Sequence, residues 1–255
     1  MQQYFAKNDD LELEDGDYHH IKNVMRMKTG DTIKVVYNNT VNICKLTNVS
    51  NSVKFDVIEK EKKINDSLII DVAFALIKEQ KLNYLLQKTT EVGVSNLIPI
   101  NTKRCVVKLD KKKEESKLKR WKKILKEASE QSNRVDVPNI LDVKNINELV
   151  SLDYDLKLLC SLNKNTKNIK KVLEKNNKCA KILLVIGPEG GFDKEEESYL
   201  LNNGFTSISL GENVLRAETA PVVALSMIKY EFMRWVVWKT YLRLRLILLI
   251  IFIII

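Results

Sequence analysis

The first 66 residues show the short apolar runs, broken by turn residues, that are typical of a small β-rich domain. Asp17–Lys28 precedes these runs and predicts a helix, because it ends at the helix-stopping sequence around Gly30. Its apolar residues are Ile21, Val24, Met25 and Met27. The predicted strands are Thr32–Tyr37, Val41–Val49 and Val53–Glu59. Asn38-Asn39 suits a tight hairpin turn, so we expect a small barrel with one helix, followed by a polar linker over Lys60–Ser67.

From residue 68 onward, buried strands alternate with amphipathic helices. The predicted strands are Leu68–Ile77, Asn96–Ile100, Leu156–Leu162, Lys181–Ile186 and Phe205–Leu210. The predicted helices are Lys78–Val92, Glu114–Arg134, Thr166–Asn176, Asp193–Asn202 and Pro221–Met233. Gly93 ends the first of these helices, and Asp193 with Glu196 forms a capping-box pattern at the start of the fourth. The alternation predicts an α/β fold with a largely parallel sheet.

Glycine and proline gather after the predicted strand Lys181–Ile186. Five of the eight glycines and two of the four prolines lie between residues 187 and 221. Most of them fall in two loops, Gly187–Phe192 and Gly211–Ala220, each of which follows a predicted strand. Because ligands of open α/β sheets bind at the carboxyl ends of strands, the loops predict a site built largely from backbone groups. A tight β–α turn without a ligand is the alternative for Gly187–Gly191.

Several common kinds of site are excluded. The chain has no G-x-G-x-x-G segment after a strand and no G-x-x-x-x-G-K-[ST] segment, which argues against a Rossmann dinucleotide site and a P-loop. No Ser or Cys has the context of a nucleophile elbow. His19 and His20 are adjacent and lack metal-ligand spacing, so no metal is expected. The four dispersed cysteines indicate reduced thiols and a cytoplasmic protein, and the N-terminus does not resemble a signal peptide.

Charge adds a second line of argument. A net charge of +9 favours an anionic partner, nucleic acid first, although solvated lysine-rich surfaces explain it equally well. The same two interpretations, phosphate contact or a solvated face, hold for the basic runs Lys111–Lys113 and Lys117–Lys123. Glu195–Glu197 is interpreted as a solvated first helical turn that complements the helix dipole.

The last ten residues, Leu246–Ile255, are all apolar and follow Arg243 and Arg245. A membrane-spanning helix needs about 20 residues, and that length would here bury both arginines. We therefore expect an atypical tail, with a docked amphipathic end second and a membrane anchor last. Deleting Met233–Ile255 should leave the activity intact and improve solubility.

Leu184–Phe192 and Leu210–Ala220 together closely resemble the signature of the RsmE family, the 16S ribosomal RNA uridine N3-methyltransferases. The resemblance covers about residues 1 to 232, in the family's order. The other segments that carry it are His20–Arg26 with Gly30-Asp31, Gln87–Val94, Arg104-Cys105 and Glu127–Arg134. The chain beyond Phe232 has no counterpart in the family pattern.

The resemblance implies a PUA-like β-barrel domain over residues 1–66 that helps to grip RNA, and a SPOUT methyltransferase domain over residues 67–233. The latter is a parallel α/β sheet whose last segment threads into a trefoil knot. It further implies S-adenosylmethionine as the cofactor, 16S rRNA of the small ribosomal subunit as the partner, N3 of uridine 1498 as the target, and a homodimer. Residues 234–255 form a hydrophobic tail outside that pattern. The alternatives are a non-catalytic RNA-binding or ribosome-assembly protein on the same fold, and a SPOUT methyltransferase with another rRNA target.

Carried onto this chain, the resemblance places the cofactor at the two glycine-bearing loops and at the end of the segment Leu158–Leu162. The implied cofactor-binding residues are Leu162, Gly187, Pro188, Glu189, Gly190, Gly191, Leu210, Gly211, Val214, Leu215, Arg216, Thr219 and Ala220. Uracil N3 carries a proton that must leave, and a cation near its carbonyl oxygens would stabilise the resulting anion. Arg216 is the candidate for that stabilising role, and Glu189 and Glu218 are candidates for the base or for bracing the loops. The RNA-binding candidates are His20, Arg26, Arg104 and Arg134, the last of which is alternatively a helix-end cation.

Overall fold

The computed structural model describes residues 1–50, 52–63, 68–109, 111–163 and 165–233. The chain divides into two compact units. Unit 1 is drawn from Met1–Ser67 and Lys117–Asn139, and unit 2 from Leu68–Ser116 and Ile140–Ile255. The tail expected at residues 234–255 and the last four residues of the expected linker lie outside the described residues. Within the described ranges, no helix has the length and hydropathy that crossing a membrane requires.

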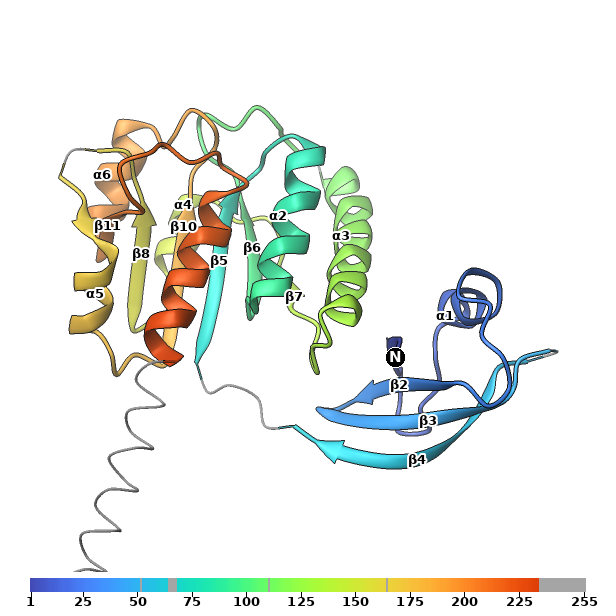
Figure 1. The fold of residues 1–255 in the computed structure, drawn as a ribbon. Helices are drawn as coiled ribbons and strands as arrows, with labels where there is room; N and C mark the ends of the chain where they lie inside the picture. The colour runs from blue at the N-terminus through green and yellow to red at the C-terminus, as the bar shows by residue number, and fades with distance from the viewer. Residues whose placement is uncertain (51, 64–67, 110, 164, 234–255) are drawn as a thin grey trace, which may run out of the picture. The chain divides into compact units, whose positions relative to one another are not determined.

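Unit 1 contains one four-stranded sheet (Figure 1). In spatial order its strands are β1 (Gln3–Phe5), β2 (Thr32–Tyr37), β3 (Thr40–Asn48) and β4 (Lys54–Lys62). The predicted hairpin is confirmed: Asn38 and Asn39 have left-handed φ values of 44° and 60°, as a type I′ turn requires. The short strand β1, parallel to β2, was not predicted. The expected linker is wrong at its start, because β4 continues through Lys62.

The first predicted helix is wrong in its bounds. The chain forms α1 (Asp15–His19), which passes directly into a π-helical turn, η1 (His20–Val24). The N–H of Met25 closes this wider turn by a 2.8 Å bond to a carbonyl five residues earlier, and Arg26 then leaves the helix with a φ of 50°. As a result Ile21 packs into the core of unit 1, whereas the Met25 residue remains 46% exposed.

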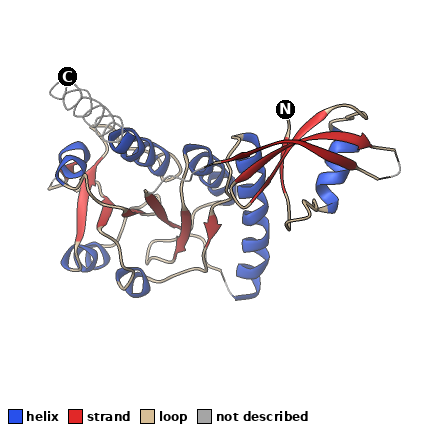
Figure 2. Ribbon diagram, turned by 90° about the horizontal axis from the view of Figure 1, so that it is seen from below, coloured by secondary structure: helices blue, strands red, loops and turns tan. Residues whose placement is uncertain are grey.

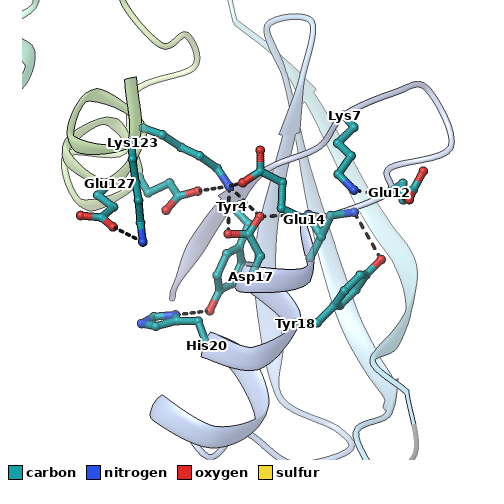
Figure 3. A network of polar contacts seen from close by, with 12 residues as sticks. Tyr4, Lys7, Glu12, Glu14, Asp17, Tyr18, His20, Lys123 and Glu127 are labelled. Atoms are coloured by element: carbon teal, nitrogen blue, oxygen red, sulfur yellow. Dashed lines mark hydrogen bonds and ion pairs between the residues drawn. The ribbon is translucent and has the colours of Figure 1, made fainter. Parts of the chain in front are cut away.

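Helix α3 (Lys111–Gln131) supplies unit 1 with a buried charge, Lys126. The Lys126 Nζ lies 2.9 Å from the Glu14 carboxylate and 2.7 Å from that of Asp17. Figure 3 shows Glu14 and Asp17 within a network of polar contacts. Only 17% of the Lys126 side chain is exposed. A charge buried to this degree is tolerated when it is paired, so these contacts fix α3 against α1.

Unit 2 is organised around a seven-stranded sheet in which every described strand pairing is parallel. In spatial order its strands are β7 (Asn139–Ile140), β6 (Asn96–Ile100), β5 (Ile69–Ala75), β10 (Lys181–Ile186), β8 (Leu156–Cys160), β11 (Phe205–Ser209) and β9 (Lys167–Asn168). The predicted parallel α/β sheet is therefore confirmed. The central strands β5 and β10 are almost wholly buried, as expected for strands covered on both faces.

Helices cover both faces of this sheet (Figure 2). They are α2 (Glu79–Val92), α4 (Ile146–Val150), α5 (Ile169–Lys175), α6 (Lys194–Asn202) and a helix over residues 220–233. Gly93 ends α2 in the left-handed conformation, with a φ of 99°, as predicted. The helix predicted at Thr166–Asn176 begins later, because the chain first adds β9 to the sheet and Asn168 then caps α5.

Candidate active site

The loops that follow three neighbouring strands surround one cavity of about 750 Å³. These strands are β8, β10 and β11, which lie close together in the sheet, so their carboxyl ends meet at one edge. The predicted residues that line the cavity are Leu162, Gly187, Pro188, Glu189, Gly190, Gly191, Leu210, Gly211, Val214, Leu215, Arg216 and Ala220, together with Arg104. Glu218 and Thr219 do not line it. The structure thus brings together two loops that are separated in sequence.

The loop after β10 is a tight turn with little room for side chains. The N–H of Gly191 donates to the carbonyl of Pro188 at 2.8 Å, and Gly191 has a left-handed φ of 67°. A Cβ on Gly187 would lie 3.0 Å from the Phe192 ring, closer than packing allows. Both glycines therefore have a steric reason to be present, and they leave backbone groups at the cavity wall.

Two cations hold this loop from outside. The Lys81 Nζ lies 3.0 Å from the Glu189 carboxylate, and the Arg104 guanidinium donates to the carbonyl of Gly190 at 2.9 Å. Burial by itself would raise the pKa of Glu189, but a backbone hydrogen bond and Lys81 outweigh it and lower this pKa below its usual value. Glu189 is consequently ionised and already paired.

Helix α6 begins directly beside the cavity. The predicted capping box is confirmed: the Asp193 side chain accepts from the N–H of Glu195 at 3.0 Å, and Glu196 reaches back to the N–H of Asp193. The interpretation of Glu195–Glu197 as a solvated turn is wrong for two of its residues. Glu196 is buried and accepts from a backbone N–H of another loop, and Glu197 accepts from a hydroxyl after β8.

The loop after β11 presents both apolar and charged groups to the cavity. Val214 lines the cavity and is 72% exposed. The Arg216 side chain is exposed, and among the described residues its guanidinium takes part in no hydrogen bond or ion pair. The carbonyl of Arg216 accepts from the N–H groups of Thr219 and Ala220 at 2.9 Å, where the helix over residues 220–233 begins. A ligand in the cavity could pair with the Arg216 guanidinium and cover the Val214 side chain.

Glu218 has a different environment from Glu189. It is 8% exposed, and one of its carboxylate oxygens has no hydrogen-bond partner in the part of the chain that the structure describes. It belongs to the turn that starts the helix over residues 220–233 and lies outside the cavity lining.

Sequence reasoning did not single out several other residues of the lining. Phe192, Ser209 and Asn213 lie in or beside the two glycine-bearing loops, whereas Cys160, Ser161 and Asn163 lie at the end of β8, which has no glycine. Their position at the end of an apolar strand, beside the loop already suspected, was the available signal. Burial raises the pKa of the Cys160 thiol to about 12, so it stays protonated and is a poor nucleophile.

The four RNA-binding candidates are divided between the two units. Arg104 lines the cavity of unit 2, whereas His20, Arg26 and Arg134 belong to unit 1. The His20 Nδ1 is 3.0 Å from the Tyr4 hydroxyl, and Arg26 is exposed at its left-handed φ. The Arg134 guanidinium lies 2.8 Å from the Asp136 carboxylate, and only 12% of the side chain is exposed.

The described residues contain no group of three or more His, Cys, Asp or Glu side chains arranged to hold a metal ion. A cavity rimmed by backbone groups, an arginine and apolar side chains suits an organic ligand with a flat apolar part.

Comparison with known proteins identifies relatives along nearly the whole chain. Residues 65–229 match an RNA methyltransferase domain, and residues 13–57 match an RNA methyltransferase PUA domain. The chain is 36% identical over 249 residues to ribosomal RNA small subunit methyltransferase E of Bacillus subtilis, covering 91% of this chain and 97% of the relative.

Two solved structures were determined with S-adenosylmethionine bound. A putative methyltransferase from Legionella pneumophila is 28% identical with a TM-score of 0.83, and ribosomal RNA small subunit methyltransferase E from Neisseria gonorrhoeae is 25% identical with a TM-score of 0.80. Each comparison covers 90% of this chain and 97% of the other. The chain therefore belongs to the RNA methyltransferase family that includes the ribosomal RNA small subunit methyltransferases E.

Proposed function

We propose that this protein transfers a methyl group from S-adenosylmethionine to N3 of a uridine in 16S rRNA, at position 1498. The observation that carries the proposal is the cavity at the ends of β8, β10 and β11, where backbone groups surround one unpaired arginine, Arg216. Its family membership and the S-adenosylmethionine-bound neighbours support the same reaction.

The residues present fit the cofactor. A volume of about 750 Å³ lies within the range of pockets for ligands of this size. Backbone groups of Gly187, Gly190, Gly211, Val214 and Leu215 would hold the adenine and ribose. When bound, the cofactor supplies an activated methyl group on a sulfonium centre. The exposed Val214 side chain would offer the adenine ring an apolar contact.

Methylation of uracil N3 requires loss of the N3 proton, which leaves negative charge on the two flanking carbonyl oxygens. Arg216 can donate to these oxygens, because the residue lines the cavity and no hydrogen bond or ion pair engages its guanidinium among the described residues. Such a donor stabilises the charge as it develops and orients the ring. We assign this role to Arg216.

The two candidates for the carboxylate that accepts the proton differ in position and in their polar partners. Glu189 lines the cavity, but its lowered pKa and its pair with Lys81 make it a weak base. Glu218 has an unpaired oxygen but lies outside the lining. Glu189 therefore meets the positional requirement, and we assign the bracing of the second loop to Glu218.

We also propose the wider family arrangement for this chain: a PUA-like RNA-binding domain over residues 1–66, a knotted methyltransferase domain over residues 67–233, a homodimer, and a cytoplasmic location. Exposed apolar side chains support the dimer. Tyr84 on α2 and Met227 and Tyr230 on the helix over residues 220–233 are 46%, 37% and 62% exposed. The two helices are adjacent, because a Cβ on Gly93 would meet Lys229 at 3.3 Å.

The test is transfer of labelled methyl groups from S-adenosylmethionine to small ribosomal subunits. Arg216→Ala should lower the turnover number by about 100-fold, as expected for the loss of a donor to a developing anion, and Arg216→Lys by less. Both variants should fold as the wild type does, because the side chain is exposed. Mass spectrometry of digested rRNA identifies the modified nucleoside.

Two results would contradict the proposal in different ways. Folded wild-type protein that shows no S-adenosylmethionine binding by calorimetry would indicate a non-catalytic RNA-binding protein. Transfer to a different nucleoside would retain the enzyme class but reject the target.

A further inference from the structure

Arg104 joins the loop after β10 to the start of α6. One guanidinium nitrogen donates to the carbonyl of Gly190 at 2.9 Å, and another lies 3.8 Å from the Asp193 carboxylate. The Gly190 backbone is part of the cavity wall, and Asp193 caps α6. A single side chain therefore contacts both the middle and the end of the segment that separates β10 from α6.

Arg104 itself projects from a well-fixed turn. The N–H of Cys105 donates to the carbonyl of Thr102 at 3.1 Å, and the Cys105 side chain is buried beneath that turn. The N–H of Lys103 donates to the buried Glu196 carboxylate at 2.8 Å. Because the backbone of this turn is fixed, the Arg104 guanidinium can hold its partner in one position with little further loss of conformational freedom.

The other contacts of the loop do not reach the Gly190 carbonyl. Lys81 pairs with the Glu189 side chain, and the Phe192 ring packs against Gly187. The hydrogen bond within the turn uses the carbonyl of Pro188. Among the described contacts, Arg104 is the side chain that fixes the orientation of the Gly190 peptide group.

We propose that Arg104 is a positioning residue for the cofactor: it fixes the Gly190 peptide so that the backbone wall of the cavity is already arranged to receive S-adenosylmethionine. The proposal deepens the proposed function and rests on it. It differs from the RNA-binding role that the sequence favoured for Arg104, because the consequence of losing the guanidinium is weaker cofactor binding.

Arginine suits this position better than lysine. The planar guanidinium can donate to a carbonyl with one nitrogen and face a carboxylate with another, whereas an ammonium group is a single point charge. Arg104→Lys should therefore restore part of the effect of Arg104→Ala and not all of it.

The experiment compares Arg104→Ala, Arg104→Lys and the neighbouring variant Lys103→Ala. Lys103 pairs with Glu195 and Asp193 but makes no described contact with Gly190 and does not line the cavity. Calorimetry measures the Kd for S-adenosylhomocysteine, and steady-state kinetics give separate KM values for S-adenosylmethionine and for small ribosomal subunits. Thermal unfolding of each variant, checked in parallel, reports folding.

Arg104→Ala should raise the Kd and the cofactor KM by about tenfold, the size of effect expected for a lost hydrogen bond from a charged donor. The turnover number at saturating substrates and the KM for ribosomal subunits should stay within about threefold of wild type. The Kd of Arg104→Lys should lie between those of wild type and Arg104→Ala, and the Kd of Lys103→Ala should equal that of wild type.

An unchanged Kd together with a raised KM for ribosomal subunits would overturn the proposal and assign Arg104 to RNA. An equal loss of cofactor binding in Lys103→Ala would also overturn it, since the effect would then come from the turn as a whole. Wild-type protein that binds no S-adenosylhomocysteine would instead reject the proposed function.

Discussion

Gly187 and Arg104 show what single residues reveal before and after the structure is known. Gly187 could be singled out from the sequence, because clustered glycines mark unusual backbone. The structure was needed to show that the Phe192 ring leaves no room for a side chain at Gly187. Arg104 contacts the carbonyl of a residue 86 positions away. Contacts of this kind have no local sequence pattern, so the candidate residues were predictable and their partners were not.

A prediction at this scale concerns Glu130 on α3. Burial raises the pKa of this carboxyl from 4.5 to about 7, although Lys126 at 3.7 Å opposes the shift. Between these values the folded state binds the proton more tightly than the unfolded state, so the stability that Glu130 contributes is present at low pH and is lost as the pH rises through about 7. Tyr4, Asp17 and Glu127 are the other titratable groups that act on it.

Glu130→Gln mimics the protonated form. The free energy of unfolding of this variant should match wild type at pH 5 and exceed it by about 1 kcal/mol at pH 8, since solvent screens part of the effect. Urea denaturation at both pH values measures the difference. Glu127→Gln, whose carboxylate is 61% exposed, is the control and should show no such trend. A Glu130→Gln variant that loses stability at pH 8 would show that the charged form is the favoured one.

At the scale of elements, bounds were predictable where turn residues border an apolar run. The predicted bounds of β2, β6 and β10 are confirmed. Turn residues such as Gly, Asn or Ser, or a loop, end each of these apolar runs. The π turn η1 and the two-residue strand β9 were missed for a physical reason. The hydrogen bond of a π turn spans one residue more than that of an α turn, a difference too small to show in the sequence pattern. Strand β9 forms because it pairs with the otherwise unpaired edge of β11.

The hairpin between β2 and β3 gives a second prediction. Both turn residues have positive φ, a conformation that asparagine tolerates and glycine adopts without strain. Asn39→Gly should therefore stabilise unit 1 by about 0.5 kcal/mol, measured by thermal unfolding. Asn39→Val, with a branched side chain at the same φ of 60°, should destabilise it. Equal stability of the two variants would mean that the backbone conformation of the turn does not affect the stability of unit 1.

At the scale of the whole molecule, the alternation of strands and helices was enough to predict a parallel α/β sheet. The strand order was not predictable, because β10 enters between β5 and β8 although it follows both in the chain. Nor did the sequence indicate that residues 117–139 would join unit 1. Both features depend on contacts between segments that are distant in sequence.

The third prediction sets the end of the methyltransferase fold. Phe232 and Glu231 are 8% and 5% exposed, whereas Met233 is 57% exposed. Deleting Met233–Ile255 should therefore leave methyl transfer within about twofold of wild type and improve solubility, since it removes a long apolar segment. A deletion that begins at Glu231 is the matched control and should lower the thermal unfolding temperature, because it removes a buried phenylalanine. Loss of S-adenosylmethionine binding in the first deletion would show that the tail belongs to the fold.

The central position of β10 also governs when the sheet can assemble. Lys181 of β10 pairs with Ile69 of β5, more than one hundred positions earlier in the chain. During synthesis, β5 therefore leaves the ribosome with the backbone N–H and C=O groups of one edge unpaired until β10 follows, on the order of 5–20 s later at ordinary translation rates. Contacts this distant in sequence also fold slowly. The nascent chain consequently passes through a stage at which a chaperone that binds exposed strands would protect it from aggregation.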